Sequence, residues 1–522
     1  MISAINVSLQ YGKRVLFKDV NIKFVAGECY GIIGANGSGK STFLKVLSGE
    51  ITPNKGEVAK ARDKRMSVLE QNQNAFDGLT AVDCVIGGHE KLYKLMKEQD
   101  ALYALGDALS DAQGVRLADI MNEYAELDGW EADANARTML SGMGVEDIYH
   151  DTKMGDLDAK IKVKVLLARA VFGNPDILIM DEPTNNLDLK SVRWLEEFLL
   201  DFKNTVIIVS HNRHFLNKVC TSICDIDFGQ ISMFAGNYDF WYESSQLILR
   251  QQKEANKKAE QRAEELKEFI ARFSANASKS RQATSRKKEL EKLTIADIKP
   301  SSRKYPYINF DIEREVGNEI LAVEGLTLNG YFKNVSFRVN KGDRIAFLSN
   351  KSLIISKLFD CIMGECKADS GTIEFGKTIT SAYLPSDNRK YFDGVKLNLV
   401  DWLKQFSKDT NETFIRSWLG RMLFGGEEAL KSAHVLSGGE KMRCMLSRVM
   451  LAKGNFLILD EPTNHLDLES ITALNEGMKK YKGVMLFASQ DEEVLRTVAN
   501  RIIDINEDKF IDKMCTYEEY VK

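Results

Sequence analysis

The chain has 522 residues, of which 44% are hydrophobic and 28% charged, and a formal net charge of −4. This length predicts at least two domains, and the composition is ordinary for a globular protein. No apolar run approaches the roughly 18 residues that cross a bilayer, and the N-terminal sequence is not that of a signal peptide, so we expect neither feature. The eight cysteines are scattered without the spacing of a metal site, which favours reduced thiols in a cytoplasmic protein.

The first strong motif along the chain begins at Gly34. The segment GANGSGKS matches G-x-x-x-x-G-K-[ST] and follows the apolar run YGII, which predicts a strand, a phosphate-binding loop and a helix. Glycines let backbone N–H groups close around phosphate oxygens, Lys40 adds a positive charge, and the Ser41 hydroxyl suits Mg²⁺. We expect nucleotide to be bound by Gly34, Ala35, Asn36, Gly37, Ser38, Gly39, Lys40, Ser41 and Thr42.

A second motif places two carboxylates at the end of an apolar run. The residues ILIM precede Asp181 and Glu182, which predicts a buried strand with both acids at its end. In phosphoryl transfer, Asp181 would contact the magnesium ion and Glu182 would polarise the attacking water. A phosphate loop followed by such a strand predicts binding and hydrolysis of ATP or GTP.

The two halves of the chain repeat each other. DEPTNNLDL begins at Asp181 and DEPTNHLDL at Asp460, an offset of 279, whereas FKDVNIKF from Phe17 and FKNVSFRV from Phe332 differ by 315. The two offsets differ by 36, so the first half contains about 36 residues that the second half lacks. We place this insertion at about residues 88–125, where the sequence is charged and has a helical pattern.

The stretch between the repeats, about residues 241–306, differs in composition. It holds 16 Lys and Arg against 9 Asp and Glu, a balance of +7, so the remainder of the chain carries −11. Apolar residues recur there at helical spacing, a polar segment follows, and a second helical pattern comes after it. This order predicts a helical hairpin with a first arm of roughly 30 residues. The expected fold class is therefore α/β, with tandem P-loop domains at 1–240 and 307–522 joined by this linker.

These motifs, in this order, resemble those of the ATP-binding cassette superfamily over nearly the whole chain. The resemblance implies that Tyr11 stacks on adenine, that Gln71 contacts magnesium and water, and that His211 is the catalytic switch residue at the γ-phosphate. It implies too that two cassettes pair head to tail across loops containing Asp188 and Asp467. The signature opposite the first phosphate loop would then be LSGGEK, with Ser437, Gly438, Gly439 and Glu440 at the nucleotide.

The two composite sites expected from this pairing are unequal. The first combines the intact loop of the first cassette with LSGGEK of the second. In the second site, Ser349, Ile354 and Ile355 replace the first and last loop glycines and the lysine, LDAKIK from Leu157 replaces the signature, and Gln490 replaces the switch histidine. β-Branched residues disfavour the loop geometry and the charge is lost. We expect only the first site to hydrolyse nucleotide.

Two cassettes and a basic linker in one chain resemble the ABC-F family of translation factors. The segments GANGSGKSTF, DEPTNNLDL, GNYD and RFSANASKSRQATSR are similar to its YbiT-like branch. The resemblance implies a cytoplasmic, monomeric ATPase that uses ATP and Mg²⁺ and binds the ribosome at the exit site. The linker would reach towards peptidyl-tRNA, and the insertion at 88–125 would be an arm that contacts the ribosome.

The linker also carries a region without acids, between Phe269 and Lys288. Such segments bind RNA phosphates by releasing counterions. We expect RNA contacts from Arg272, Lys279, Arg281, Arg286, Lys287 and Lys288.

Other functions stay open on the sequence. An ATPase subunit of a membrane importer also lacks spans of its own, although a basic linker has no use there. Ribosome protection against antibiotics is an alternative within the same family, although the linker tip is short. A DNA-associated ATPase is a third, because basic hairpins also bind DNA. Many charged segments are only solvated surfaces.

Overall fold

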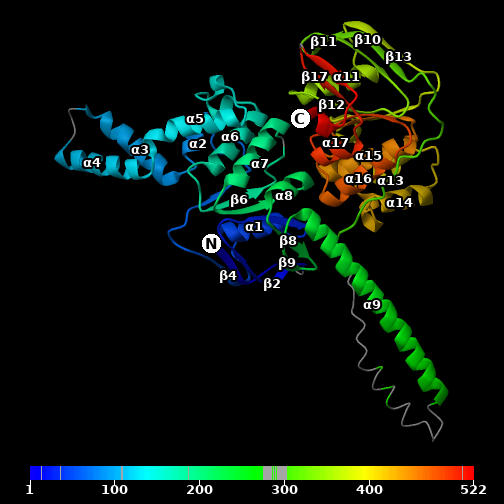
Figure 1. Ribbon diagram of the computed structural model, residues 1–522, viewed down its shortest axis with the longest axis horizontal. Coiled ribbons are helices and arrows are strands. Elements are labelled where there is room, and N and C mark those ends of the chain that lie inside the picture. The colour runs from blue at the N-terminus through cyan, green and yellow to red at the C-terminus, as the bar shows by residue number, and fades with distance from the viewer. Residues whose placement is uncertain are drawn as a thin grey trace.

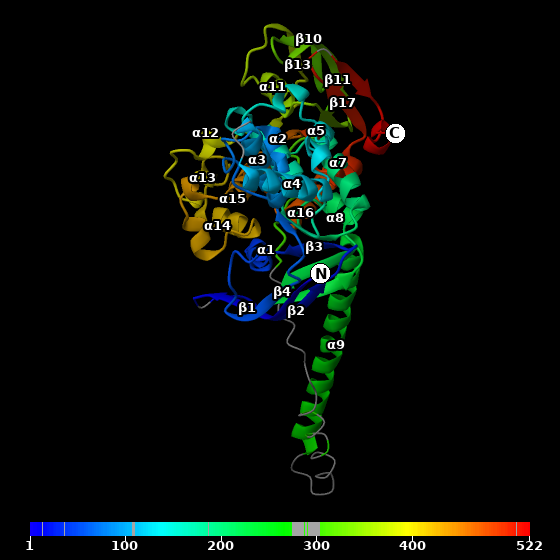
Figure 2. The same cartoon turned by 90° about the vertical axis from the view of Figure 1, so that its left-hand side faces the viewer.

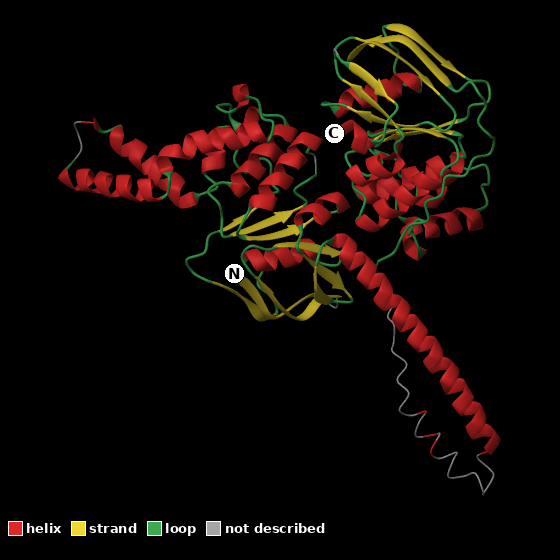
Figure 3. Ribbon diagram, in the orientation of Figure 1, coloured by secondary structure: helices red, strands yellow, loops and turns green. Residues whose placement is uncertain are grey.

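The structure is a computed structural model of the chain and describes residues 1–12, 14–35, 37–106, 110–185, 187–273, 285, 287, 290, 303–507 and 509–521. Two α/β cassettes lie side by side, and one long helix projects away from both (Figures 1 and 3). A view at right angles shows the same arrangement (Figure 2).

The first cassette contains two sheets. Its strands are β1 (Ile2–Tyr11), β2 (Arg14–Phe24), β3 (Cys29–Gly34), β4 (Lys55–Lys60), β5 (Met66–Val68), β6 (Ile177–Asp181), β7 (Thr205–Val209), β8 (Ser222–Asp227) and β9 (Gln230–Ala235). One sheet has the order β5-β6-β7-β3-β8-β9 and is parallel except for the pair β8–β9; the other is antiparallel, in the order β2-β1-β4. The apolar runs of β6 and β7 are buried, as expected for parallel strands covered on both faces.

Helices cover this sheet and extend beyond it. They are α1 (Lys40–Ser48), α2 (Ala81–Ile86), α3 (Glu90–Tyr103), α4 (Asp111–Glu126), α5 (Ala132–Gly142), α6 (Ala159–Val171), α7 (Leu189–Asp201) and α8 (Arg213–Val219). α3 and α4 pack against each other and project from the cassette as a pair (Figure 1). An ion pair of 2.8 Å between Arg116 and Glu98 joins them. This pair of helices occupies the segment where the sequence places an arm.

The second cassette repeats this topology. Its strands are β10 (Leu321–Leu328), β11 (Phe332–Val339), β12 (Arg344–Leu348), β13 (Ser370–Phe375), β14 (Ser381–Leu384), β15 (Phe456–Asp460), β16 (Val484–Ala488), β17 (Arg501–Ile505) and β18 (Phe510–Lys513). Their orders are β14-β15-β16-β12-β17-β18 and β11-β10-β13, which match the first cassette strand for strand. The helices are α11 (Ser352–Ile362), α12 (Arg389–Phe392), α13 (Leu399–Lys404), α14 (Glu412–Arg421), α15 (Gly438–Ala452), α16 (Leu468–Lys480), α17 (Glu492–Val498) and α18 (Tyr517–Val521).

A single helix, α9 (Tyr238–Phe273), forms the first part of the linker. Its 36 residues correspond to about 54 Å, somewhat more than the first arm expected from the sequence. Tyr238 and Trp241 in its first turn are buried in the core of the first cassette, so the helix starts from a fixed base. Apart from residues 287 and 290, the returning arm of the expected hairpin lies outside the described residues. Within the described part of the chain, no helix has the length and apolarity needed to cross a membrane.

Candidate functional site

The candidate site lies where three parallel strands end. β7 stands between β3 and β6 in the sheet, so the carboxyl ends of all three meet at one edge. Lys40 is the first residue of the helix after β3. Asp181 ends β6 and Glu182 follows it, and His211 comes two residues after β7. Residues from three distant parts of the sequence are thereby brought together.

The phosphate loop has the backbone of an anion cradle. Gly37 and Gly39 have φ of 73° and 101°, in the region that glycine adopts without strain. A Cβ on Gly34 would lie 2.7 Å from the carbonyl oxygen of Ile226, so only glycine fits there. The Lys40 ammonium donates to the carbonyls of Gly34 (2.8 Å) and Ala35 (3.3 Å). It is therefore folded back over the mouth of the loop.

Charges of both cassettes act on Lys40. Its side chain is only 8% exposed, and burial lowers the pKa of its ammonium group. Glu182 and Asp181 of the first cassette and Glu469 and Asp467 of the second all act to raise that pKa again. Acids at the start of α16 in the second cassette thus contribute to the electrostatics of the phosphate-loop lysine.

Glu182 and His211 form a close pair. The Glu182 carboxyl accepts a hydrogen bond from the His211 backbone N–H at 3.1 Å, and its other oxygen lies 3.4 Å from His211 Nε2. Burial raises the pKa of Glu182 to about 8, with Asp181 adding to the rise and the His211 N–H and Lys40 opposing it. Burial and Lys40 lower the pKa of His211 to about 4. The pair is suited to exchanging a proton with a water molecule held beside it.

Three oxygen-bearing side chains suited to Mg²⁺ meet at the same edge. Gln71 follows β5 and donates its amide N–H to Asp181 Oδ2 at 3.0 Å, and Ser41 lies in the first turn of α1. The described residues contain no cluster of three His, Cys, Asp or Glu that would hold a metal. Mg²⁺ usually binds through one or two carboxylates with phosphate oxygens and waters, so this sparse set fits the ion.

The signature segment of the second cassette is a tightly packed helix start. Ser437 caps α15 in a reciprocal capping box with Glu440, which fixes both side chains. A Cβ on Gly438 would lie 3.0 Å from the ring of His465, and one on Gly439 would lie 2.6 Å from its carbonyl oxygen. The two glycines thus let the signature segment rest on the loop that leads to Asp467.

The remaining expected site residues fall in different places. Tyr11 is exposed at the end of β1. Asp188 caps α7 and accepts a 2.6 Å hydrogen bond from Lys164; its pKa is lowered because Lys164 and Ser191 outweigh the opposing effect of burial. Lys287 is exposed, and Arg272 lies within α9. The residues Asn36, Lys279, Arg281, Arg286 and Lys288 lie outside the described part of the chain.

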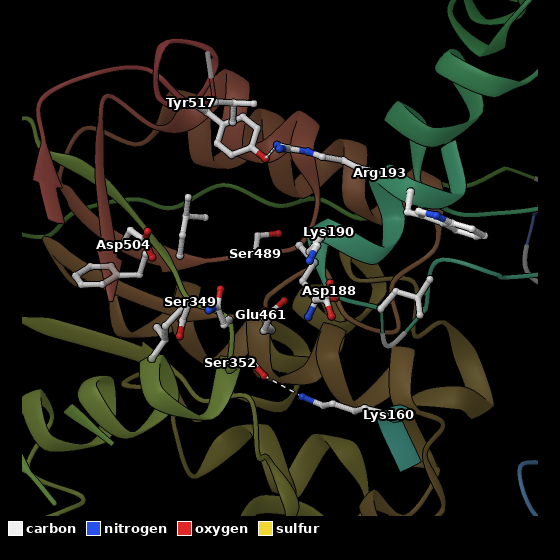
Figure 4. Close-up of a pocket in the computed structure, with 18 of the residues that line it drawn as sticks. Lys160, Asp188, Lys190, Arg193, Ser349, Ser352, Glu461, Ser489, Asp504 and Tyr517 are labelled. Atoms are coloured by element: carbon white, nitrogen blue, oxygen red, sulfur yellow. Dashed lines mark hydrogen bonds between the residues drawn. The ribbon is translucent and has the colours of Figure 1, made fainter. Parts of the chain in front are cut away.

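The second composite site is a cleft of about 660 Å³ between the cassettes (Figure 4). By the offset of 315, a phosphate-loop helix would begin at position 355, but α11 begins at Ser352. The loop has shortened because its last residues joined the helix. Ile354 and Ile355 lie in the first turns of α11, and both are buried. This backbone has no cradle of the kind found around Gly37.

Opposing residues partly close this cleft. Lys160, in the segment that replaces the signature, donates to Ser352 at 3.2 Å, as Figure 4 shows. Glu461 faces the cleft, and one of its carboxyl oxygens is buried without a hydrogen-bond partner. Burial and Asp460 raise the pKa of Glu461 to about 7. The carboxylates of a catalytic strand remain, and Lys160 of the first cassette opposes the rise in the Glu461 pKa, but Ile355 stands where the phosphate-loop lysine would be.

Comparison with known proteins identifies the family. The sequence profile described as ABC transporter matches residues 17–185 and 332–464, and a second profile of that description matches 224–310. The Bacillus subtilis (strain 168) protein named Uncharacterized ABC transporter ATP-binding protein YkpA is 57% identical over 100% of this chain and 97% of its own length. The chain belongs to the ATP-binding cassette family.

Further likenesses place the chain within that family. The Escherichia coli O157:H7 protein named Probable ATP-binding protein YbiT is 40% identical over 100% of this chain and 99% of its own length. The chain is thus an ABC-F-type ATPase of the YbiT-like branch. Among solved structures, the archaeal ribosome recycling factor aABCE1, in complex with the stalk protein aP1, has a TM-score of 0.58 at 17% identity, covering 96% of this chain and 87% of that chain. This likeness confirms the tandem-cassette fold.

The sequence did not predict two residues that act at the ATP-binding site of this ABC-F-type chain. The guanidinium of Arg14 donates to the Gly37 carbonyl at 2.6 Å and supports the phosphate loop from β2. Glu469 acts on Lys40 from the second cassette. The repeat itself held a signal for Glu469, because the position 279 residues earlier is Lys190, of opposite charge.

Proposed function

We propose that this ABC-F-type ATPase hydrolyses ATP at one composite site and uses closure of that site to place its basic linker on ribosomal RNA and tRNA. The observation that carries the proposal is the asymmetry between the sites. Acids from both cassettes act on the charge of Lys40, whereas Ile355 occupies its place in the other site. One site is equipped to bind and hydrolyse ATP, and the other serves to join the cassettes.

In the proposed mechanism, the loop Gly34–Thr42 and the signature Ser437–Glu440 hold the triphosphate from opposite sides. Lys40 leaves the loop carbonyls and binds the β- and γ-phosphates. Mg²⁺, held by Ser41 and Asp181 with Gln71, would neutralise phosphate charge.

Glu182 and His211 act on the attacking water. Glu182, as the carboxylate, takes its proton. His211 orients the γ-phosphate while its ring stays neutral. Loss of the γ-phosphate removes the group that both cassettes grip, so they separate.

The linker carries this change to RNA. The proposed boundaries are 1–240 and 307–522 for the cassettes, 241–306 for the linker and about 88–125 for the arm. α9 projects away from both cassettes (Figure 2), and the basic segment follows it. The proposed partner is the ribosome, with rRNA and tRNA at the exit and peptidyl sites, bound by a monomeric cytoplasmic protein. The aABCE1 neighbour, described as a ribosome recycling factor, supports this choice of partner.

Co-sedimentation tests the proposal. Glu182→Gln protein should pellet with ribosomes in the presence of ATP and stay in the supernatant without it, because ATP holds the cassettes closed. Replacing Arg281 and Lys288 by Gln should reduce pelleting, and added salt should weaken it steeply. Pelleting that ignores ATP, or that survives digestion of the RNA, would contradict the proposal. Binding to membrane vesicles instead would favour a transporter subunit.

A further inference from the structure

Arg303, where the chain returns from the linker, bonds to both cassettes at once. Its guanidinium donates to Asp225 of β8 at 3.2 Å and lies 3.6 Å from Asp227. Its Nε lies 3.0 Å from Glu469 of α16, in the second cassette. The guanidinium also stacks 4.7 Å from the ring centroid of Trp241 in the first turn of α9. One side chain therefore joins the base of the linker, the sheet of one cassette and a helix of the other.

The charges of this cluster are buried. The side chains of Arg303, Asp225, Asp227 and Glu469 are 10%, 12%, 13% and 7% exposed. Trp241 donates its indole N–H to Asp225 at 3.2 Å and shields the group further. A charge buried to this degree is costly unless it is paired. Arg303 is therefore tied to its acids strongly, and any movement of Glu469 changes its surroundings.

Glu469 also contributes to the electrostatics of the ATP-binding site. It is the second residue of α16, two positions after the interface residue Asp467, and its charge acts on Lys40. Two cations therefore act on Glu469: Arg303, at 3.0 Å, and Lys40, through its charge. The first cassette has Lys190 at the equivalent position. Within the described residues, the second site thus has a cation where the first has the Glu469 carboxylate.

We propose that Arg303 is a positioning residue that couples ATP occupancy at Lys40 to the base of the linker through Glu469. A triphosphate beside Lys40 takes over the interactions of that lysine and repels the Glu469 carboxylate, which leaves Arg303 as its cation. Closure thereby strengthens the bond between Glu469 and Arg303, and Arg303 presses Trp241 and α9 onto β8. When the cassettes separate, Glu469 leaves with α16 and the base of α9 loosens. The coupling rests on the proposed composite site but needs no ribosome.

Hydrogen exchange of the first turns of α9, residues 238–248, measures this coupling directly. The Glu182→Gln protein would be compared with and without saturating ATP and Mg²⁺. Couplings between sites are commonly 5- to 150-fold, so we expect ATP to slow exchange there by about tenfold. Arg303→Met should abolish this difference. Glu469→Gln should abolish most of it, while Arg303→Lys should keep part because the charge remains.

Arg501→Met is the matched control. Arg501 is an equally buried guanidinium on β17, bonded to Asp343 at 2.7 Å and Asp512 at 2.6 Å. This variant should lower the melting temperature while keeping the effect of ATP on α9. Nucleotide binding would be followed in every variant with a fluorescent ATP analogue, so that each is compared at saturation.

Two results would overturn the inference. One is an unchanged response of α9 in Arg303→Met, and the other is the absence of any response in the parent protein. Ribosome co-sedimentation, run in parallel, separates the two proposals. If the parent fails to pellet with ribosomes but α9 still responds to ATP through Arg303, the coupling holds and the ribosomal function fails.

Discussion

Glu182 and Glu461 share the same sequence motif but stand in different surroundings. Glu182 has His211 and Lys40 nearby, and both act on its pKa. Glu461 faces a cleft where Ile355 replaces the lysine.

We expect Glu182→Gln to lower kcat for ATP hydrolysis by about 10³-fold, the range of lost general-base catalysis. Glu461→Gln should stay within about twofold of the parent. Phosphate release at saturating ATP measures both, and equal effects would refute the one-site mechanism.

The raised pKa of Glu182 predicts a pH profile. Only the carboxylate accepts a proton from water, and burial raises its pKa to about 8. Because kcat/KM reports ionisations of the free enzyme, it should rise about tenfold per pH unit below pH 8 and level off above it. ATP affinity measured at the same pH values serves as the control. A flat profile between pH 6.5 and 8 would show that Glu182 is ionised throughout.

At the scale of elements, α11 shows why one substitution would not restore the second phosphate loop. The helix begins at Ser352, where the repeat would have loop, and Ile354 is buried in the apolar core. We expect Ile355→Lys to leave the stoichiometry at one ATP per chain. A lysine alone supplies charge but no ring of backbone N–H groups. Equilibrium dialysis measures the stoichiometry, with Lys40→Ala as the variant that should lose the one bound nucleotide.

The sequence predicted the two cassettes, the arm and the first linker helix, but not where α11 starts. The offsets of 279 and 315 gave two cassettes of one topology, and the matching strand orders confirm it. The loss of glycines predicted a failed phosphate loop at Ser349–Ile355. It did not predict an earlier helix start, because a helix boundary depends on whether Ile354 and Ile355 find a core to pack against. That core is formed by strands distant in sequence.

At the scale of the whole molecule, the cassettes also meet through a cluster of charges around the buried Glu492. Glu492 on α17 lies 3.0 Å from His214 and 3.5 Å from Arg193, both in the first cassette. Arg193 also donates to the Tyr517 hydroxyl at 3.0 Å (Figure 4). Although burial acts to raise it, the pKa of Glu492 is held at about 2 by His214, Arg193 and Arg496. Its carboxylate is therefore charged at neutral pH and holds the cassettes together.

Glu492→Gln should weaken this interface. Loss of charged hydrogen bonds in a buried setting costs about 2 kcal/mol, and we expect the first thermal unfolding transition to move to lower temperature. Glu476→Gln, which removes an exposed ion pair of 2.9 Å with Lys479, should change stability by no more than about 0.5 kcal/mol. Scanning calorimetry of both variants makes the comparison. Equal shifts would mean that the Glu492 cluster stabilises the protein no more than an exposed ion pair does.

The same carboxylate gives a pH dependence with a definite sign. The folded-state pKa of about 2 lies below the ordinary value of 4.5, so the stabilisation is complete above pH 4.5 and is lost as the pH falls towards 2. The parent should lose stability faster than Glu492→Gln across that window. Parallel melting curves from pH 5 to pH 3 would check this, and identical slopes would contradict it.

Contacts between the cassettes were the part of the candidate site that sequence could not supply. The head-to-tail pairing followed from a family resemblance, and the charges of Asp467 and Glu469 on Lys40 agree with it. The bonds of Arg303 to Glu469 and of His214 to Glu492 join residues far apart in the chain. No periodicity or motif marks such pairs, because they are fixed by how whole domains pack. The opposite charges at Lys190 and Glu469 are the one trace of these contacts in the repeat.

The buried first turn of α9 makes the linker a lever with its pivot in the first cassette. Trp241 is fixed in the core, and the helix extends for 36 residues, or about 54 Å. A rigid rod of about 54 Å that turns by about 5° at its pivot carries its far end through about 5 Å. Shifts of a few tenths of an ångström around Arg303, close to the pivot, would thus be enlarged to several ångströms at the far end of the helix. A very small displacement near the ATP-binding site therefore becomes a large displacement at the far end of the linker helix.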